Sequence, residues 1–247
     1  MRLALFCALL IPCLCAAADA RGLVEASLRR HGGAPYLYEE LTLLSSDAAG
    51  RYTVRTARHY VRMRGGALQR LLVIDTPHDA RGSALLVRRD AGGALQRDVV
   101  LPALVSRREG KAEAVAPDGP LFGTDFMLAD IEEEMPDDFR YEAEGETDID
   151  RVPHFVVRAL PREGAGPQRR LYLRKDNLFV SRIDYGDGHG RPARRQSFRD
   201  PRAHESGAWR AAMVLMENLR DGHRTLLKVE RRVHSADYVP DDVFQRR

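Results

Sequence analysis

Apolar and polar residues alternate with a period of two along most of this chain. The alternation recurs in segments that span residues 37–43, 61–64, 85–88, 99–101, 155–159, 170–174, 179–185 and 225–233. Successive side chains of a β-strand point to opposite faces, so this pattern predicts strands with one apolar and one arginine-rich face. In the last segment Val229 and Val233 fall in the apolar phase, and Arg232 falls in the outward phase.

Turn signals separate the alternating segments. Gly65-Gly66, Gly92-Gly93, Asp176-Asn177, Gly186–Gly190 and Asp221-Gly222 stand where hairpin turns are expected. An apolar run, Leu71–Ile74, follows the first turn and is predicted as the next strand. Consecutive hairpins predict an antiparallel sheet. Alternating β-α-β units and internal repeats of fixed period are absent from the sequence.

Two segments depart from the period of two. Leu23–Arg30 predicts a short helix that ends at a Gly-Gly-Ala-Pro stretch. Gly119–Glu134 combines apolar residues with glycines and ends in acids. We expect a second helix over Phe126–Glu134, with Asp125 as its N-cap and its acids directed outward.

The first twenty residues predict a secretory signal peptide. Arg2 precedes an apolar run, Leu3–Cys15, and Ala18-Asp19-Ala20 fits a cleavage site before Arg21. Residues 21–247 then form the mature chain, predicted as a single domain. All cysteines lie in the leader: Cys7, Cys13 and Cys15. The mature chain therefore depends on a hydrophobic core rather than on disulfides.

The charge balance argues against a nucleic-acid partner. The formal net charge is +3, and basic residues are spread along the chain without interleaved aromatic residues. Beyond the leader no apolar run is long enough for a transmembrane helix.

The apolar face of so long a sheet must be covered, and the pattern leaves two ways open. Helical material is scarce, so a curled sheet under two small elements would leave apolar space where an acyl chain or another apolar ligand could bind. Alternatively, the sheet closes on its own side chains. The pattern of residues favours neither alternative over the other.

Motifs of catalysis and cofactor binding are absent from the sequence. There is no G-x-S-x-G, no P-loop and no H-E-x-x-H, and the mature chain has no cysteine to complete a zinc site. We therefore predict no cofactor and no metal. Asp125 is the best candidate for a catalytic carboxylate, but helix capping is the preferred interpretation.

Several blocks resemble a known family, in the right order. They are DTPHDARGSALLV (75–87), VVLPALVSRR (99–108), LFGTDFMLADIEE (121–133), RLYLRKDNLFVSRIDYGDGHGR (170–191), MVLMENLRDGHRTLLKV (213–229) and VPDDVFQRR (239–247). The family counterparts of the first four are P-x-D-x-K-G-T-x-L-L, YLPALRRVRR, FMGSDFSYEDL and LWVDKENYLPLKVEYYDKSGK. Over Tyr36–Arg247 the chain resembles the outer-membrane lipoprotein-sorting proteins of the LolA/LolB-like superfamily.

The resemblance implies a mainly β (α+β) fold: a curled antiparallel sheet, an unclosed β-barrel or half-barrel, with short helices forming a lid over an apolar cavity. It implies a non-enzymatic periplasmic carrier of lipid or lipoprotein acyl chains, in transport toward the outer membrane. The residues expected to line the cavity are Leu41, Leu43, Val61, Met63, Leu85, Val87, Val99, Leu101, Val157, Leu173, Ile183, Leu227 and Val229. The residues expected to form the lid are Phe122, Gly123, Asp125, Phe126 and Met127.

Two other functions are open alternatives. The fold could act as an envelope sensor or as an accessory subunit of an inner-membrane exporter of the resistance-nodulation-division (RND) type, docking through the acids of residues 130–138. An enzyme that uses Asp125 is the less favoured alternative.

Overall fold

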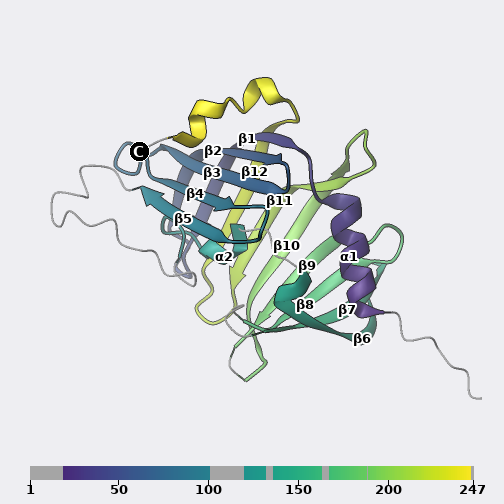
Figure 1. Ribbon diagram of the computed structural model, residues 1–247. Coiled ribbons are helices and arrows are strands. Elements are labelled where there is room, and N and C mark those ends of the chain that lie inside the picture. The colour runs from purple at the N-terminus through teal and green to yellow at the C-terminus, as the bar shows by residue number, and fades with distance from the viewer. Residues whose placement is uncertain (1–18, 101–119, 132–135, 163–166, 188, 246–247) are drawn as a thin grey trace, which may run out of the picture.

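The computed structural model describes residues 19–100, 120–131, 136–162, 167–187 and 189–245. It contains one large antiparallel sheet with short helices around it (Figure 1). Most of the predicted signal peptide, Leu101 and Glu132–Glu134 lie outside the described residues. The signal peptide and the single domain therefore stay predictions.

The described residues form twelve strands in the sheet. They are β1 (Tyr36–Ser46), β2 (Tyr52–Arg64), β3 (Ala67–Thr76), β4 (Ala84–Arg89), β5 (Leu95–Val100), β6 (Phe139–Ile149), β7 (Val152–Pro161), β8 (Arg169–Arg174), β9 (Val180–Gly186), β10 (Pro192–Ala203), β11 (Trp209–Asn218) and β12 (Arg224–Val233). The helices in the described part are α1 (Ala20–His31), α2 (Leu128–Ile131) and the 3₁₀ helices η1 (Pro136–Asp138), η2 (Ala236–Tyr238) and η3 (Asp241–Gln245).

The strand order is β5-β4-β3-β2-β1-β12-β11-β10-β9-β8-β7-β6. Almost every neighbouring pair joins strands that are consecutive in the sequence, as the turn signals predict. The exception is β1 with β12, which joins an arm of β1–β5 to an arm of β6–β12. The order ends at β5 and β6, so the sheet is not closed. The predicted unclosed antiparallel sheet is confirmed.

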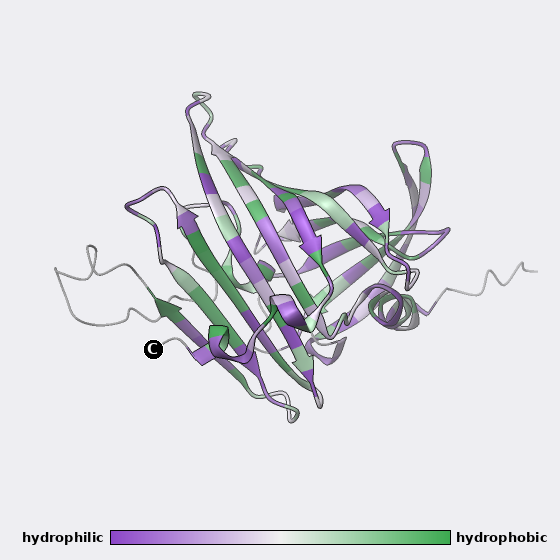
Figure 2. Cartoon of the chain, turned by 90° about the horizontal axis from the view of Figure 1, so that it is seen from above, coloured by the Kyte–Doolittle hydropathy of each residue, from purple (hydrophilic) through white to green (hydrophobic). Residues whose placement is uncertain are grey.

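The apolar run in β3 is explained by burial on both faces. Leu72 and Ile74 belong to the hydrophobic cluster on the inner face of the sheet. Leu71 and Val73 belong to a second cluster, which Phe244 of the C-terminal segment completes. Figure 1 shows this yellow segment beside the first strands. Other long strands show the alternating bands of hydropathy that a sheet with one apolar face produces (Figure 2).

Helix α1 includes the predicted Leu23–Arg30 and packs on the other arm of the sheet. Its Val24 joins a cluster with Phe139, Val157 and Leu173. The second predicted helix is shorter in the described part of the chain, where α2 covers only Leu128–Ile131. None of the described helices has the length and hydrophobicity needed to cross a membrane.

The hydrophobic cluster under α1 allows the packing of the core to be tested by mutation. Leu173 is 0% exposed, whereas Leu44 on β1 is 38% exposed. Leu173→Ala should lower the free energy of unfolding by about 2–5 kcal/mol, because it leaves a cavity in a packed cluster. The matched Leu44→Ala should change it by less than about 1 kcal/mol. Urea denaturation measures both, and equal losses would contradict the packing described here.

Candidate functional site

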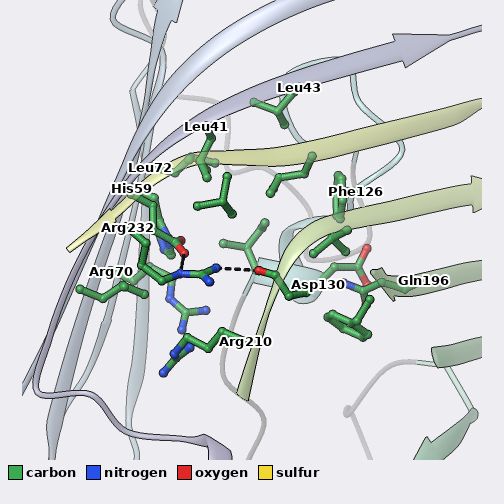
Figure 3. Close-up of a pocket in the computed structure, with 18 of the residues that line it drawn as sticks. Leu41, Leu43, His59, Arg70, Leu72, Phe126, Asp130, Gln196, Arg210 and Arg232 are labelled. Carbon is green, nitrogen blue, oxygen red and sulfur yellow. Dashed lines mark hydrogen bonds and ion pairs between the residues drawn. The ribbon is translucent and has the colours of Figure 1, made fainter. Parts of the chain in front are cut away.

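A cavity of about 340 Å³ lies between the inner face of the sheet and segment 120–131 (Figure 3). Leu41 and Leu43 of β1 line it beside Val229 and Leu227, their register partners on β12. Its other apolar lining residues are Leu37, Leu72, Leu121, Phe126, Ile131, Phe179, Val180, Phe198, Trp209, Ala211 and Val214. The pairing of β1 with β12 thus builds the central wall of the cavity.

Segment 120–131, which we call the plug, is a compact loop that leads into α2. The Leu121 amide donates a hydrogen bond of 2.8 Å to the Phe126 carbonyl oxygen, and Pro120 forms a β-bridge with Met127. The Thr124 hydroxyl donates to the Leu121 carbonyl oxygen at 2.7 Å. These bonds satisfy backbone groups that would otherwise be buried without partners.

Glycine is required at the tip of the plug. Phe122 and Gly123 both have positive φ, at 50° and 68°. A side chain at Gly123 would be strained in this conformation and would meet the Arg55 guanidinium at 3.3 Å. The glycine therefore has a defined role in the turn.

The plug contacts both arms of the sheet. Leu121 and Leu128 belong to the inner cluster of the first arm. Phe126, which is 2% exposed, packs with Tyr185 and Met216 of the second arm. The plug thereby bridges the two arms, which are joined within the described part of the sheet by the β1–β12 pair.

Two carboxylates attach the plug to the second arm. The Asp125 carboxylate accepts a hydrogen bond from the Thr225 hydroxyl at 2.7 Å. The Asp130 carboxylate is 0% exposed and lies 2.6 Å from the Arg194 guanidinium. The predicted N-cap role of Asp125 is therefore wrong, because α2 begins three residues later and Asp125 is bound to β12. The outward direction predicted for the acids is wrong for Asp130.

One end of the cavity is polar. Glu39 of β1 is bound to the ring of His59 at 2.9 Å and to the guanidinium of Arg232 at 2.6 Å. Arg70 and Arg210 also line this end. Figure 3 shows the three arginines with His59 on one side of the cavity and Phe126 on another.

Burial controls the protonation of this group. Desolvation lowers the pKa of His59, aided by the charges of Arg70 and Arg210 and opposed by Glu39. Burial alone would raise the pKa of Glu39, but the hydrogen bond from His59 and the charge of Arg232 outweigh it and lower the pKa to about 2. Glu39 is thus a carboxylate and His59 a neutral ring at neutral pH.

A β-bulge directs Arg232 into the cavity. Leu41 pairs with Val229, whereas Glu40 pairs with Arg231, so the register skips Glu230. An extra residue reverses which side chains face inward beyond it. The predicted phase of this strand is therefore wrong after Val229. Arg232 lines the cavity, and Val233 packs on the opposite face of the sheet, against the second cluster that contains Phe244.

The predicted cavity residues fall into several groups. Leu41, Leu43, Leu227 and Val229 line the cavity. The remaining described ones pack elsewhere: Leu85, Val87 and Val99 in or against the inner cluster, Val61 and Met63 with Leu68, and Val157, Leu173 and Ile183 in or against the cluster under α1. Of the predicted lid, Phe126 lines the cavity, Phe122 packs against the inner cluster, and Gly123, Asp125 and Met127 shape or attach the plug.

The polar lining residues were missed, although the sequence holds a signal for some of them. Glu39 stands in the same phase as Leu37 and Leu41, and Arg70 in the same phase as Leu72. A charged residue in the apolar phase of a strand marks a position where charge faces the interior. For Arg232 the bulge hides that signal.

The curated proteins contain no match to this chain. A family model described as an uncharacterised protein matches residues 66–247. The chain belongs to this family. Within the described residues, no group of three or more histidine, cysteine or acidic side chains could hold a metal ion.

Several solved structures share the fold, including the following three. A putative outer membrane lipoprotein-sorting protein domain from Vibrio parahaemolyticus has a TM-score of 0.79 at 18% identity, covering 92% of this chain and 98% of its own. A DUF1329 family protein from Desulfovibrio piger has a TM-score of 0.79 at 20% identity, and the match covers 91% of this chain and 96% of that protein. A LolA superfamily protein from Nitrosomonas europaea has a TM-score of 0.68 at 14% identity, and the match covers 91% of this chain and 98% of that protein. The suspected LolA-like fold is confirmed.

Protonation of the buried histidines should make stability depend on pH. Burial lowers the pKa of His31, His59, His154 and His234. The unfolded chain therefore binds more protons than the folded chain below about pH 6.5, and the free energy of unfolding should fall as pH decreases from there. Because the pKa of Glu39 is lowered from 4.5 to about 2, its protonation should reduce the free energy of unfolding further as the pH falls from about 4.5 toward 2.

Two variants isolate the contribution of His59 to the pH dependence of the free energy of unfolding. His59→Asn should make the decline of the free energy of unfolding shallower below about pH 6.5, because one buried titrating ring is removed. His223→Asn, at an exposed turn position, should leave the slope unchanged. Denaturant unfolding across the pH range measures both slopes, and a His59→Asn slope equal to that of the unmodified protein would contradict the assignment.

The buried ion pair of the plug should be costly to break. Asp130→Ala should lower the free energy of unfolding by about 3–5 kcal/mol, since it leaves the mostly buried Arg194 without its carboxylate. Asp137→Ala removes a pair whose acid is 80% exposed and should have a much smaller effect, because solvent screens the pair. Chemical denaturation measures the difference, and a loss as small for Asp130 as for Asp137 would refute the anchoring role.

Proposed function

We propose that the protein is a non-enzymatic periplasmic carrier whose cavity holds an acyl chain of a lipid or lipoprotein during transport toward the outer membrane. The observation that carries the proposal is the cavity of about 340 Å³ between the curled sheet and the plug. Most of its lining is aliphatic or aromatic. The Vibrio domain with the same fold, described as a putative outer membrane lipoprotein-sorting domain, supports this interpretation.

The cavity volume limits the cargo. Small-molecule sites commonly enclose about 300–1,000 Å³, and this cavity lies at the low end of that range. One acyl chain therefore fits the described space better than several. Burial of about fourteen methylenes at ~0.8 kcal/mol each would supply on the order of 10 kcal/mol before ordering costs. That is enough for a carrier to sequester its cargo.

The described residues favour the carrier over the two alternatives. The sensor or exporter subunit was expected to dock through acids of residues 130–138, but Asp130 is buried in its pair with Arg194. Asp137 is paired with Arg21 of α1. The enzyme was expected to use Asp125, whose carboxylate is bound to Thr225. Asp125 and Asp130 hold the plug in place, which accounts for these two acids without a partner or a substrate.

Two experiments test the carrier. Protein purified from its own host should carry bound lipid in native mass spectrometry, and the lipid-free protein should take up a fluorescent fatty acid. Filling the cavity with Val214→Phe or Leu227→Phe should weaken that uptake at least about tenfold, because the added rings occupy the space of the chain.

Val54→Phe provides the matched control. Val54 is 46% exposed, so a larger side chain there should leave uptake unchanged. Thermal unfolding of each variant checks that it folds. A protein that is free of lipid from its host and takes up no fatty acid would overturn the proposal.

A further inference from the structure

His31, the last residue of α1, holds that end of the helix to the sheet through both nitrogens of its ring. The backbone amide of Trp209 at the start of β11 donates a hydrogen bond to the Nδ1 atom at 3.0 Å. The Nε2 atom lies 2.8 Å from the carbonyl oxygen of Asn177, in the turn between β8 and β9. The ring therefore joins α1 to two separate hairpins of the second arm.

These bonds fix the protonation state of the ring. A backbone amide can only donate, so the Nδ1 atom of His31 accepts and carries no proton. The Nε2 atom then carries the proton and donates it to the carbonyl oxygen of Asn177. Only the neutral ring can make both bonds, because a second proton on Nδ1 would point at the N–H group of Trp209. Protonation thus breaks the link to β11.

The same ring forms part of the cavity wall. This part of the wall consists of His31, Phe179, Phe198 and Trp209. The ring of His31 meets the ring of Phe179 edge-on, with 5.8 Å between the two centroids. The Phe179 ring in turn contacts those of Phe198 and Trp209, at centroid distances of 6.3 and 6.4 Å. Helix α1 thereby contributes to an aromatic end of the cavity through His31.

The two halves of α1 are attached to the sheet in different ways. Its buried apolar residues, Ala20 and Val24, lie in the first half and pack in the core cluster. After Ser27 every residue of the helix is at least partly exposed. Gly33 follows with a φ of 74°, a conformation that glycine adopts without strain. The last turn can therefore leave the sheet about this glycine while the first half stays packed.

The surroundings of the ring oppose a positive charge on it. Burial lowers the pKa of His31, its backbone hydrogen bond opposes that effect, and the charges of Arg30 on α1 and Arg210 on β11 lower the pKa further. At the turn between β8 and β9, Arg174 lies 2.6 Å from Asp176 as an ion pair. A ring that leaves the sheet returns to water and to its ordinary pKa of 6.5. The detached form binds the proton more tightly, so acid favours detachment.

We infer that His31 is a proton-operated latch on the cavity. As a neutral ring it holds the last turn of α1 against the aromatic end of the wall, and as a charged ring it releases that turn and opens the cavity for its cargo to leave. The inference rests on the proposed carrier function and adds a means of release. It needs no other residue to change its charge.

Trp209 reports the state of the latch directly, because it is the single tryptophan of the chain. Its fluorescence and the quenching of that fluorescence by acrylamide are measured from about pH 8 to about pH 5. Quenching should increase in one transition centred below about pH 6.5, because departure of the ring exposes the indole. Circular dichroism at each pH checks that the protein stays folded.

Cargo release is measured with a fluorescent long-chain alcohol, which has no group that titrates in this range. Its rate of dissociation in stopped-flow mixing should rise about fivefold or more as the pH falls through the transition, because opening of the wall provides an exit. The bound alcohol should also move the fluorescence transition to lower pH, since a ligand that prefers the closed form opposes protonation.

Three variants assign the transition to one ring. His31→Gln cannot be protonated but can still donate and accept, so quenching and dissociation should no longer depend on pH. Arg30→Gln removes a charge that lowers the pKa of His31 and should move the transition to higher pH, which tests the latch even if the first variant fails to fold. His204→Gln, at an exposed position after β10, should behave like the unmodified protein.

The outcomes separate this inference from the carrier function. A pH dependence that persists in His31→Gln, or a fluorescence transition with no change in the dissociation rate, would overturn the latch and leave the carrier standing. An alcohol that never binds would overturn the carrier, and the release mechanism with it. Quenching and dissociation that change together and depend on His31 are the expected result.

Discussion

The pairing of β1 with β12 is the contact on which the cavity depends. It joins residues nearly the whole length of the chain apart, and it converts two meandering arms into one sheet. Its register sets Leu41 beside Val229 and Leu43 beside Leu227, which makes the apolar wall. The bulge at Glu230 in the same pair turns Arg232 toward Glu39. One pairing therefore produces both the apolar and the polar part of the site.

The plug completes what the unclosed sheet leaves open. Its apolar residues contact both arms, and polar bonds from Asp125 and Asp130 fix it to the second arm. Breaking the buried Asp130–Arg194 pair would leave a charge without its partner, which opposes other positions of the plug. The plug thus covers an apolar cavity whose far end is polar.

The site was only partly predictable from the alternation of residues. The phase of β1 and β12 correctly pointed Leu41, Leu43, Leu227 and Val229 toward the interior. The same rule could not distinguish a residue that lines the cavity from Leu173, which packs under α1. Both are apolar and inward in their own strands, and the difference arises from what lies opposite each one. Glu39 and Arg70 were readable as charges in an apolar phase but were overlooked.

By itself the sequence determined most of the strands, several of their hairpins, the first helix and the antiparallel sheet, because period-two patterning and turn residues act between near neighbours. Strands β6, β10 and β11 were not predicted. The blocks that resemble the LolA/LolB-like superfamily also indicated the unclosed, curled form of the sheet. Only the tertiary structure decided that Asp125 binds Thr225, that Asp130 faces inward to Arg194, and that Arg232 enters the cavity. These outcomes depend on partners distant in sequence and on one inserted residue that reverses a strand's phase. Neither can be predicted from the local pattern of residues.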